Sequence, residues 1–302
     1  MKKTYHICLS GGNEVMFRDN NDFIRGINCL CLAAHKTQST LLAYSFMSNH
    51  VHLGVRTEHP DMLMKSFRYP YNRYFNCKYK RTGLLGERNY FKLELDGLYH
   101  LLTAIAYILR NPLHHGVAAT PFGYRYSSIS ALFKEEMGSF MTPDLLPQKS
   151  QYHFLPEGVT LPKGFKMDIT GLILPESVID VADLEHQFST ARTFIYYMNR
   201  LTSDAWKSEQ MQDKTDTPLI TLESIECGVR TQDIKTLLSN EHGRQNYYAK
   251  SDIALCKEID SRISDETIYT LTECQIRELA YQILRAERVP YEQVKRCLAG
   301  KI

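Results

Sequence analysis

The stretch 44–55 constrains the fold more than any other part of this chain. Two apolar runs flank a short polar turn in it, a pattern typical of a strand, a tight turn and a second strand. His50 and His52 stand two residues apart at the start of the second strand. Side chains at i and i+2 of a strand point to the same face, so both imidazoles should face one point while Val51 faces the core.

Seven segments of the first half carry the patterns of regular secondary structure. In chain order they are a strand at 4–10, a helix at 21–35, strands at 40–46 and 50–56, a helix at 61–79, a strand at 90–95 and a helix at 98–110. The first six give the order βαββαβ, the split βαβ arrangement. We therefore expect an α+β fold, a ferredoxin-like antiparallel sheet with helices on one face and the histidine strand in its interior. Pro70 should kink or split its helix, and Pro112 should end the last helix just before it.

The second half has a different composition. Prolines are frequent between 136 and 175, which indicates a linker or an extended crossing segment, and helical patterns dominate from 176 to 302. Two short helices within 271–300 resemble a helix-turn-helix, with a helical lid or a dimerisation module as the alternative. A chain of 302 residues exceeds one average domain. We expect a first domain at 1–135, a connection at 136–175 and a helical domain at 176–302.

Charge is distributed unevenly along the chain. Residues 1–135 contain 17 Lys and Arg against 9 Asp and Glu, whereas residues 136–302 contain 19 against 25. The first half is therefore the candidate for contact with a polyanion, and a merely solvated basic surface is the alternative.

The cysteines and the apolar runs bear on the compartment. The eight cysteines form no Cys-x-x-Cys pair, which disfavours a zinc ribbon or a disulfide framework and fits a reducing compartment. The apolar run near the start is too short for a signal peptide, and no run of 18 apolar residues occurs. We expect a soluble cytoplasmic protein with no membrane contact.

A basic aromatic segment spans 66–81. Its six aromatic residues interleave with five cations: Arg68, Arg73, Lys78, Lys80 and Arg81. Bases stack on aromatic faces and phosphates pair with cations, which is how single strands are held. The alternative is an amphipathic helix whose rings pack inward while its charges face water.

A second pair of functional groups stands on the helix predicted at 98–110 and just after it. Tyr107 and Asn111 are four residues apart, so they should share one helix face. A phenol and an amide oxygen presented together could act as nucleophile and metal ligand. Core packing for Tyr107 and helix termination for Asn111 are the alternatives.

Several pieces of the first half match a known family. They are Tyr5-His6-Ile7, Gly12-Asn13, Phe17-Arg18-Asp19, Met47-Ser48-Asn49-His50-Val51-His52-Leu53, Asn72-Arg73-Tyr74-Phe75-Asn76, Tyr107-Ile108-Leu109-Arg110-Asn111-Pro112-Leu113 and Tyr126-Ser127-Ser128. Through them, residues 5–133 resemble the REP-associated tyrosine transposases, within the HUH class of single-strand endonucleases that includes the single-tyrosine insertion-sequence transposases. Pro70 and the pair His114-His115 depart from the family pattern.

The resemblance implies a role for four residues. His50, His52 and Asn111 would bind a divalent metal. Tyr107 would be the nucleophile of a transposase-type endonuclease that cuts and rejoins single-stranded DNA near hairpins through a covalent 5′-phosphotyrosine. A donor set of imidazole nitrogens and an amide oxygen suits Mg²⁺ or Mn²⁺.

The expected DNA-binding residues are polar side chains of the first half. They are Asn13, Arg18, Arg68, Arg73, Lys78, Lys80 and Arg81. The partner would be single-stranded DNA with hairpins, and a homodimer is compatible with this reading. Two alternatives stay open: a DNA-binding regulator of the same fold that does not cut, and a metal-dependent hydrolase in which water replaces Tyr107 as the nucleophile.

Overall fold

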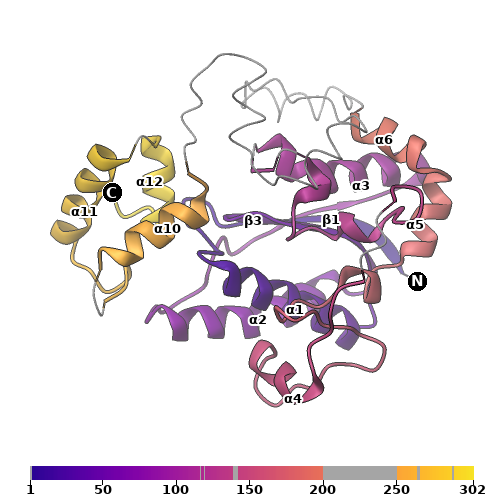
Figure 1. Cartoon of the computed structure of the whole chain (residues 1–302), viewed down its shortest axis with the longest axis horizontal. Helices are drawn as coiled ribbons and strands as arrows, with labels where there is room; N and C mark the ends of the chain where they lie inside the picture. Colours follow the sequence, from indigo (N-terminus) through magenta and orange to yellow (C-terminus); the bar gives the residue numbers. More distant parts are fainter. Residues whose placement is uncertain are drawn as a thin grey trace.

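The computed structural model describes residues 2–115, 117–118, 120–138, 142–199, 250–263, 266–287 and 289–302. Four strands organise its first half: β1 (Lys3–Ser10), β2 (Thr40–Phe46), β3 (His50–Thr57) and β4 (Phe91–Glu94). They form one antiparallel sheet in the order β2-β3-β1-β4 (Figure 1). The prediction of an α+β fold with an antiparallel sheet is confirmed, and the histidine strand β3 lies in the interior of the sheet.

Three long helices cover the two faces of the sheet. α1 (Asn20–Lys36) and α2 (Pro60–Lys78) lie side by side on one face, and α3 (Gly97–His114) lies on the other (Figure 1). The expectation of helices on one face therefore holds for the two helices of the βαββαβ unit but not for α3. The side chains of Ile7, Leu9, Val51, Leu53 and Val55 are buried in the main core, so the alternate residues of β1 and β3 are left to face α3.

Both prolines of interest lie inside helices. α2 runs continuously through Pro70, and α3 runs past Pro112 to His114 instead of ending at 110. A proline removes one N–H and crowds the carbonyl four residues back. The turn after Pro112 still closes, because the His115 N–H donates to the Asn111 carbonyl at 3.0 Å. Asn111 is consequently a helical residue, one turn after Tyr107.

The segment 142–199 packs on the first half. It contains α4 (Gln148–Gln151), α5 (Val181–Phe188) and α6 (Ala191–Asn199), with short 3-10 turns at Tyr152–Phe154 and Pro175–Ser177; two further 3-10 turns precede it at Pro121–Gly123 and Ser128–Ala131. Ile173, Phe188 and Phe194 are fully buried in the same core as the sheet. The proposed division at 135 and 175 stays a prediction, but the core of the described residues is not divided at either position.

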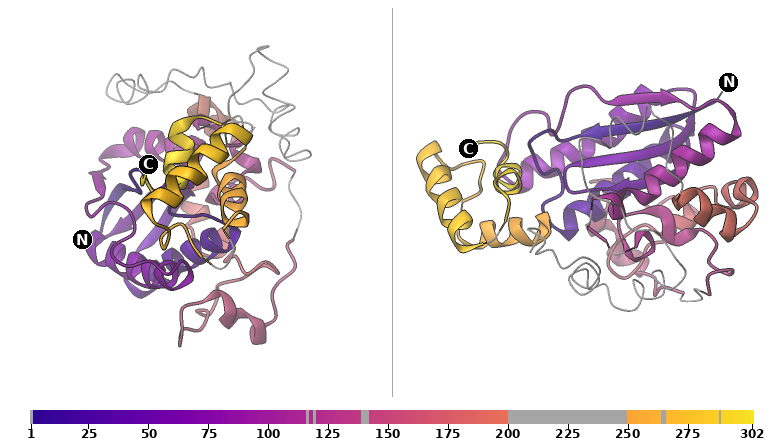
Figure 2. Two further views of the ribbon diagram at one scale, coloured as in Figure 1. Left: turned by 90° about the vertical axis from the view of Figure 1, so that its left-hand side faces the viewer. Right: turned by 90° about the horizontal axis from the view of Figure 1, so that it is seen from above.

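A second core belongs to the C-terminal helical unit, which we define as α10 (Asp252–Ser261), α11 (Glu273–Ala286) and α12 (Tyr291–Cys297). These helices lie at one end of the sheet (Figure 2). α11 and α12 occupy the range predicted to resemble a helix-turn-helix. Their core buries Leu255, Ile259, Ile276, Ile283 and Val294, together with Val15 of the first half. None of the described helices is long and apolar enough to cross a membrane.

Candidate active site

The site begins with the face of β3 that is turned toward α3. His50 and His52 lie on this face, with His52 only 6% exposed and His50 half-buried. In the antiparallel pairing with β1, Ser10 stands opposite His50 and Cys8 stands opposite His52. The ring centroids of the two histidines are 5.1 Å apart, so the alternation of the strand places both imidazoles together as the sequence predicts.

α3 supplies the other side of the site. Tyr107, Asn111 and His115 follow one another at four-residue spacing and therefore share a face. The Tyr107 ring lies 5.3 Å from the His52 ring between centroids, and the Oδ1 atom of Asn111 lies 2.9 Å from Nε2 of His50. The His115 ring lies 4.9 Å from that of His50. The four residues predicted from the sequence thus meet in one place.

Gly54 lets the helix come this close. It is the next residue after His50 and His52 on the same face of β3. A Cβ atom at this position would lie 2.7 Å from Cδ1 of Ile105 and 3.3 Å from Cδ1 of Ile108, both shorter than ordinary carbon contacts. The absence of a side chain at Gly54 therefore permits this approach of α3 to the histidines.

His6 belongs to the matching piece Tyr5-His6-Ile7, and it is a member of the site for which no role was expected. Its Nε2 atom lies 3.0 Å from Nδ1 of His52, and the two rings stack at 5.2 Å between centroids. Burial, with a smaller effect from the charge of His100, lowers the pKa of His6 to about 4, so this ring is neutral at pH 7. When His52 carries its proton on Nδ1 it donates to His6, which leaves Nε2 of His52 with a lone pair for a ligand.

The sequence contains a signal for His6. His6 and Cys8 alternate with apolar residues in the first strand, as His50 and His52 do in the third. The alternation alone does not show that His6 lies beside His52. That follows from the register of β1 against β3, in which His6 stands opposite Gly54 and diagonal to His52.

The donor set around His50 fits a divalent cation. Its Nδ1 atom lies 2.9 Å from Oδ1 of Asn49, and its Nε2 atom lies 2.9 Å from Oδ1 of Asn111. The contact with Asn111 is a hydrogen bond in this structure, and its length is also close to the separation of about 3 Å between two ligands at right angles around an ion with bonds of about 2.1 Å. In the described part of the chain Asn111 is 1% exposed and its Nδ2 atom has no hydrogen-bond partner. A metal at this point would be held by imidazole and amide groups, since no three His, Cys, Asp or Glu side chains among the described residues could hold one.

Arg18, expected to bind DNA, is a buried structural residue. It is 1% exposed, and its guanidinium donates to Oδ1 of Asp260 at 2.6 Å and to the Cys297 carbonyl at 2.7 Å. Both partners belong to the C-terminal helical unit. The expectation is corrected accordingly: in this arrangement Arg18 joins the two cores and is not presented to a polyanion.

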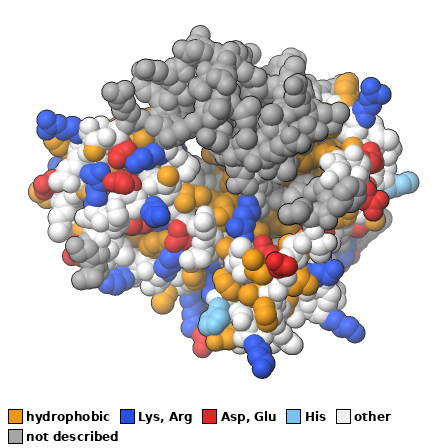
Figure 3. Space-filling view, in the orientation of Figure 1, with side chains coloured by type: hydrophobic (Ala, Val, Ile, Leu, Met, Phe, Trp, Pro, Cys, Tyr) orange, Lys and Arg blue, Asp and Glu red, His pale blue; other side chains and the backbone are white. Residues whose placement is uncertain are grey.

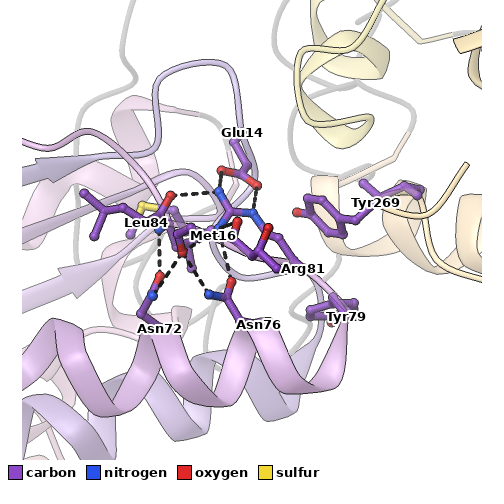
Figure 4. Close-up of polar contacts among 12 residues, drawn as sticks. Glu14, Met16, Asn72, Asn76, Tyr79, Arg81, Leu84 and Tyr269 are labelled. Atoms are coloured by element: carbon purple, nitrogen blue, oxygen red, sulfur yellow. Dashed lines mark hydrogen bonds and ion pairs between the residues drawn. The ribbon is translucent and has the colours of Figure 1, made fainter. Parts of the chain in front are cut away.

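Most cations of the basic aromatic segment also have partners within the protein. Arg81 pairs with Glu14 at 3.0 Å and, with Asn72 and Asn76, holds the backbone of the loop after α2 (Figure 4). Lys78 pairs with Asp19 and Asp22, and Arg68 donates to loop carbonyls. The rings of Phe67, Tyr71, Phe75 and Tyr79 are buried. Four of the six rings thus pack inward as in an amphipathic helix, whereas Tyr69 is 73% exposed. The role of the segment in DNA binding stays a prediction.

Three of the expected DNA-binding residues lie at the surface. Asn13 and Lys80 are exposed. The Arg73 side chain is 74% exposed and forms an ion pair with Glu157 at 3.6 Å. On the described part of the face in Figure 3, cations are interspersed with carboxylates. The positive charge counted along the first half therefore does not gather into one patch on this face.

Comparison with known proteins gives matches among solved structures. No family model matches the chain, and neither does any curated protein. Among solved structures, a REP-associated tyrosine transposase bound to a REP hairpin matches over 47% of this chain and 84% of that chain, with 12% sequence identity and a TM-score of 0.37. The chemistry open to this chain therefore has to follow from its own side chains.

Proposed function

We propose that this protein is a metal-dependent single-strand DNA endonuclease and strand transferase that uses Tyr107 as its nucleophile. The observation that carries the proposal is the meeting of α3 with β3, where a tyrosine and an amide one helical turn apart face two histidines of one strand. The motif pieces that resemble the tyrosine transposases include all four of these residues.

Each residue has a part in the proposed reaction. The Tyr107 hydroxyl loses its proton as its oxygen attacks the phosphorus of a scissile phosphodiester. The bond to the 3′ oxygen breaks, and that oxygen takes up a proton to leave as a 3′-hydroxyl, so one proton is lost and one is gained. The 5′ phosphate stays on Tyr107 as an ester. A 3′-hydroxyl attacking this ester rejoins a strand without an external energy source, because one phosphoester bond replaces another.

His50, His52 and Asn111 would hold the cation, for which Mg²⁺ or Mn²⁺ is the proposed identity. When bound, the cation supplies Lewis-acid neutralisation of the charge on the phosphate oxygens. His6 would hold the His52 ring in place, since its Nε2 atom lies 3.0 Å from Nδ1 of His52. Asn49 would do the same for His50 from the opposite side of that ring.

The test is incubation with single-stranded hairpin DNA labelled at the 5′ or the 3′ end, with Mn²⁺ or Mg²⁺, read on a denaturing gel. We expect a covalent protein–DNA adduct in the wild type that is absent from Tyr107→Phe, His50→Ala and chelated samples. Tyr99→Phe is the matched control, because Tyr99 stands on α3 two turns earlier and is half exposed. It should leave the adduct intact.

Other outcomes would favour the alternatives. Cleavage without an adduct, retained in Tyr107→Phe, would indicate a hydrolase that uses water. Binding without cleavage on each of several hairpins would favour a regulator that does not cut.

A further inference from the structure

The C-terminal helical unit touches the turn that leads into the candidate site. The Ser48 hydroxyl donates to Oδ2 of Asp252, the first residue of α10, at 2.5 Å. Ser48 lies two residues before His50 in the chain and 204 residues before Asp252. This hydrogen bond links the C-terminal helical unit to a turn that lies next to His50, a candidate metal ligand.

The turn 47–49 is also held from the side of the first half. The Ser48 carbonyl accepts from the N–H groups of Met16 at 2.7 Å and Phe17 at 3.0 Å, and the Asn49 carbonyl accepts from Gly11 N–H at 2.6 Å. A Cβ on Gly11 would lie 2.3 Å from the Glu14 carbonyl oxygen and 2.8 Å from that of Asn49. Loop 11–17 and the turn are therefore packed without spare room.

The C-terminal helical unit holds loop 11–17 as well. Val15 is buried in its core, and Arg18, directly after the loop, is bound to Asp260 and the Cys297 carbonyl. The unit thus contacts the turn 47–49 through Ser48, and it also contacts loop 11–17, which packs against that turn. The turn ends in Asn49, whose Oδ1 atom is 2.9 Å from Nδ1 of His50.

Asp252 is itself rigidly held. It is 9% exposed and accepts two hydrogen bonds from Arg296 at 2.9 Å and one from Gln293 at 3.0 Å. Burial acts to raise its pKa, but Arg296, Ser48 and Gln293 hold the pKa below its usual value, so the side chain is a carboxylate at pH 7. Its position in the first turn of α10 is favourable for a negative charge.

We propose that Asp252 is a positioning residue for His50, acting through Ser48 and the turn 47–49. The C-terminal helical unit then serves the site directly, by fixing the orientation of one imidazole. Only the catalytic consequence of this inference rests on the proposed function; the orientation of the ring does not.

The test compares single substitutions in the full-length protein. Ser48→Ala removes the donor, Ser48→Thr keeps it, Asp252→Asn removes the charge, and Glu258→Gln removes a charge from the same helix. Glu258 is the matched control because its ion pairs, to Arg262 and Lys250, lie within residues 250–302. The first readout is the pair of ring ¹⁵N signals of His50 without metal, assigned by their loss in His50→Gln. The second is kcat and KM for strand cleavage.

We expect Ser48→Ala and Asp252→Asn to shift the His50 ring signals and to lower kcat by about tenfold to a hundredfold with KM nearly unchanged, as for a misplaced catalytic group. Ser48→Thr and Glu258→Gln should match the wild type in both readouts. Unchanged His50 signals in Ser48→Ala and Asp252→Asn would overturn the inference, as would an equal shift in Glu258→Gln. A wild type that cleaves no DNA would overturn the proposed function, and the ring signals would still decide the inference.

Discussion

Adding one methyl group at Gly54 should separate the two halves of the candidate site. The Cβ of Gly54→Ala would lie 2.7 Å from Cδ1 of Ile105, about 0.8 Å short of the lower end of ordinary carbon contact. Relief requires the end of the Ile105 side chain to move, and this side chain is fully buried. Overpacking of this kind costs about 1–3 kcal/mol of unfolding free energy.

The same overpacking should slow the proposed reaction of Tyr107. Tyr107 follows Ile105 by two residues on α3, so a helix that moves back by about 1 Å carries the phenol with it. A displacement of that size at a catalytic group can reduce the rate on the order of a hundredfold. We expect Gly54→Ala to form the adduct about a hundredfold more slowly while it still folds.

A double-mutant cycle distinguishes this packing argument from a general loss of stability. Ile105→Val removes Cδ1 and alone should cost about 0.5–1.5 kcal/mol. Combined with Gly54→Ala it frees the space that the new methyl group needs, so the double variant should be at least about 1 kcal/mol more stable than additivity predicts. Urea unfolding followed by circular dichroism measures all four proteins. Strict additivity, or a Gly54→Ala variant with the stability and activity of the wild type, would refute the reasoning.

Three further predictions concern burial, docking and the metal. The pKa of His6 falls from 6.5 to about 4 on folding, so between these pH values the unfolded chain binds a proton that the folded chain does not bind. The unfolding free energy should therefore drop by roughly 3 kcal/mol from about pH 7 to pH 4. His6→Gln should reduce this dependence on pH, as measured by urea unfolding at a series of pH values. Arg18→Met keeps the buried aliphatic stem but loses the hydrogen bonds to Asp260 and the Cys297 carbonyl, so its unfolding free energy should be about 3 kcal/mol lower than that of the wild type. A decrease below about 0.5 kcal/mol would contradict the role of Arg18 in joining the two cores. Asn111→Asp adds a charged ligand and should tighten Mn²⁺ binding about tenfold in calorimetry, with no change counting against a metal at this position.

The secondary structure of the first half could be predicted closely, because its strands and helices carry clear periods of two and of 3.6 residues. The end of α3 could not. A proline is expected to end a helix because it has no N–H to donate to the carbonyl four residues earlier. In the structure α3 continues past Pro112, and the His115 N–H still donates to the Asn111 carbonyl. The position of α3 on the far face also depends on Gly54, whose role appears only when β3 and α3 are placed together.

The residues of the candidate site were predictable where a local period brings them together. His50 with His52, and Tyr107 with Asn111, are pairs of this kind. The surface role expected for Arg18 failed because its acidic partner is 242 residues away in the chain. No local pattern shows such pairing, so a cation in a basic sequence segment cannot be told from one that is neutralised in the fold.

The central claim is that Tyr107 forms a covalent bond to DNA, and peptide mass spectrometry of the trapped protein–DNA adduct tests it most directly. After nuclease and protease digestion, we predict that the peptide containing Tyr107 carries a 5′-phosphonucleotide on that residue, in the presence of Mn²⁺ and not after chelation. A nucleotide on another residue, or unmodified Tyr107 in a sample that has cleaved its DNA, would contradict the account.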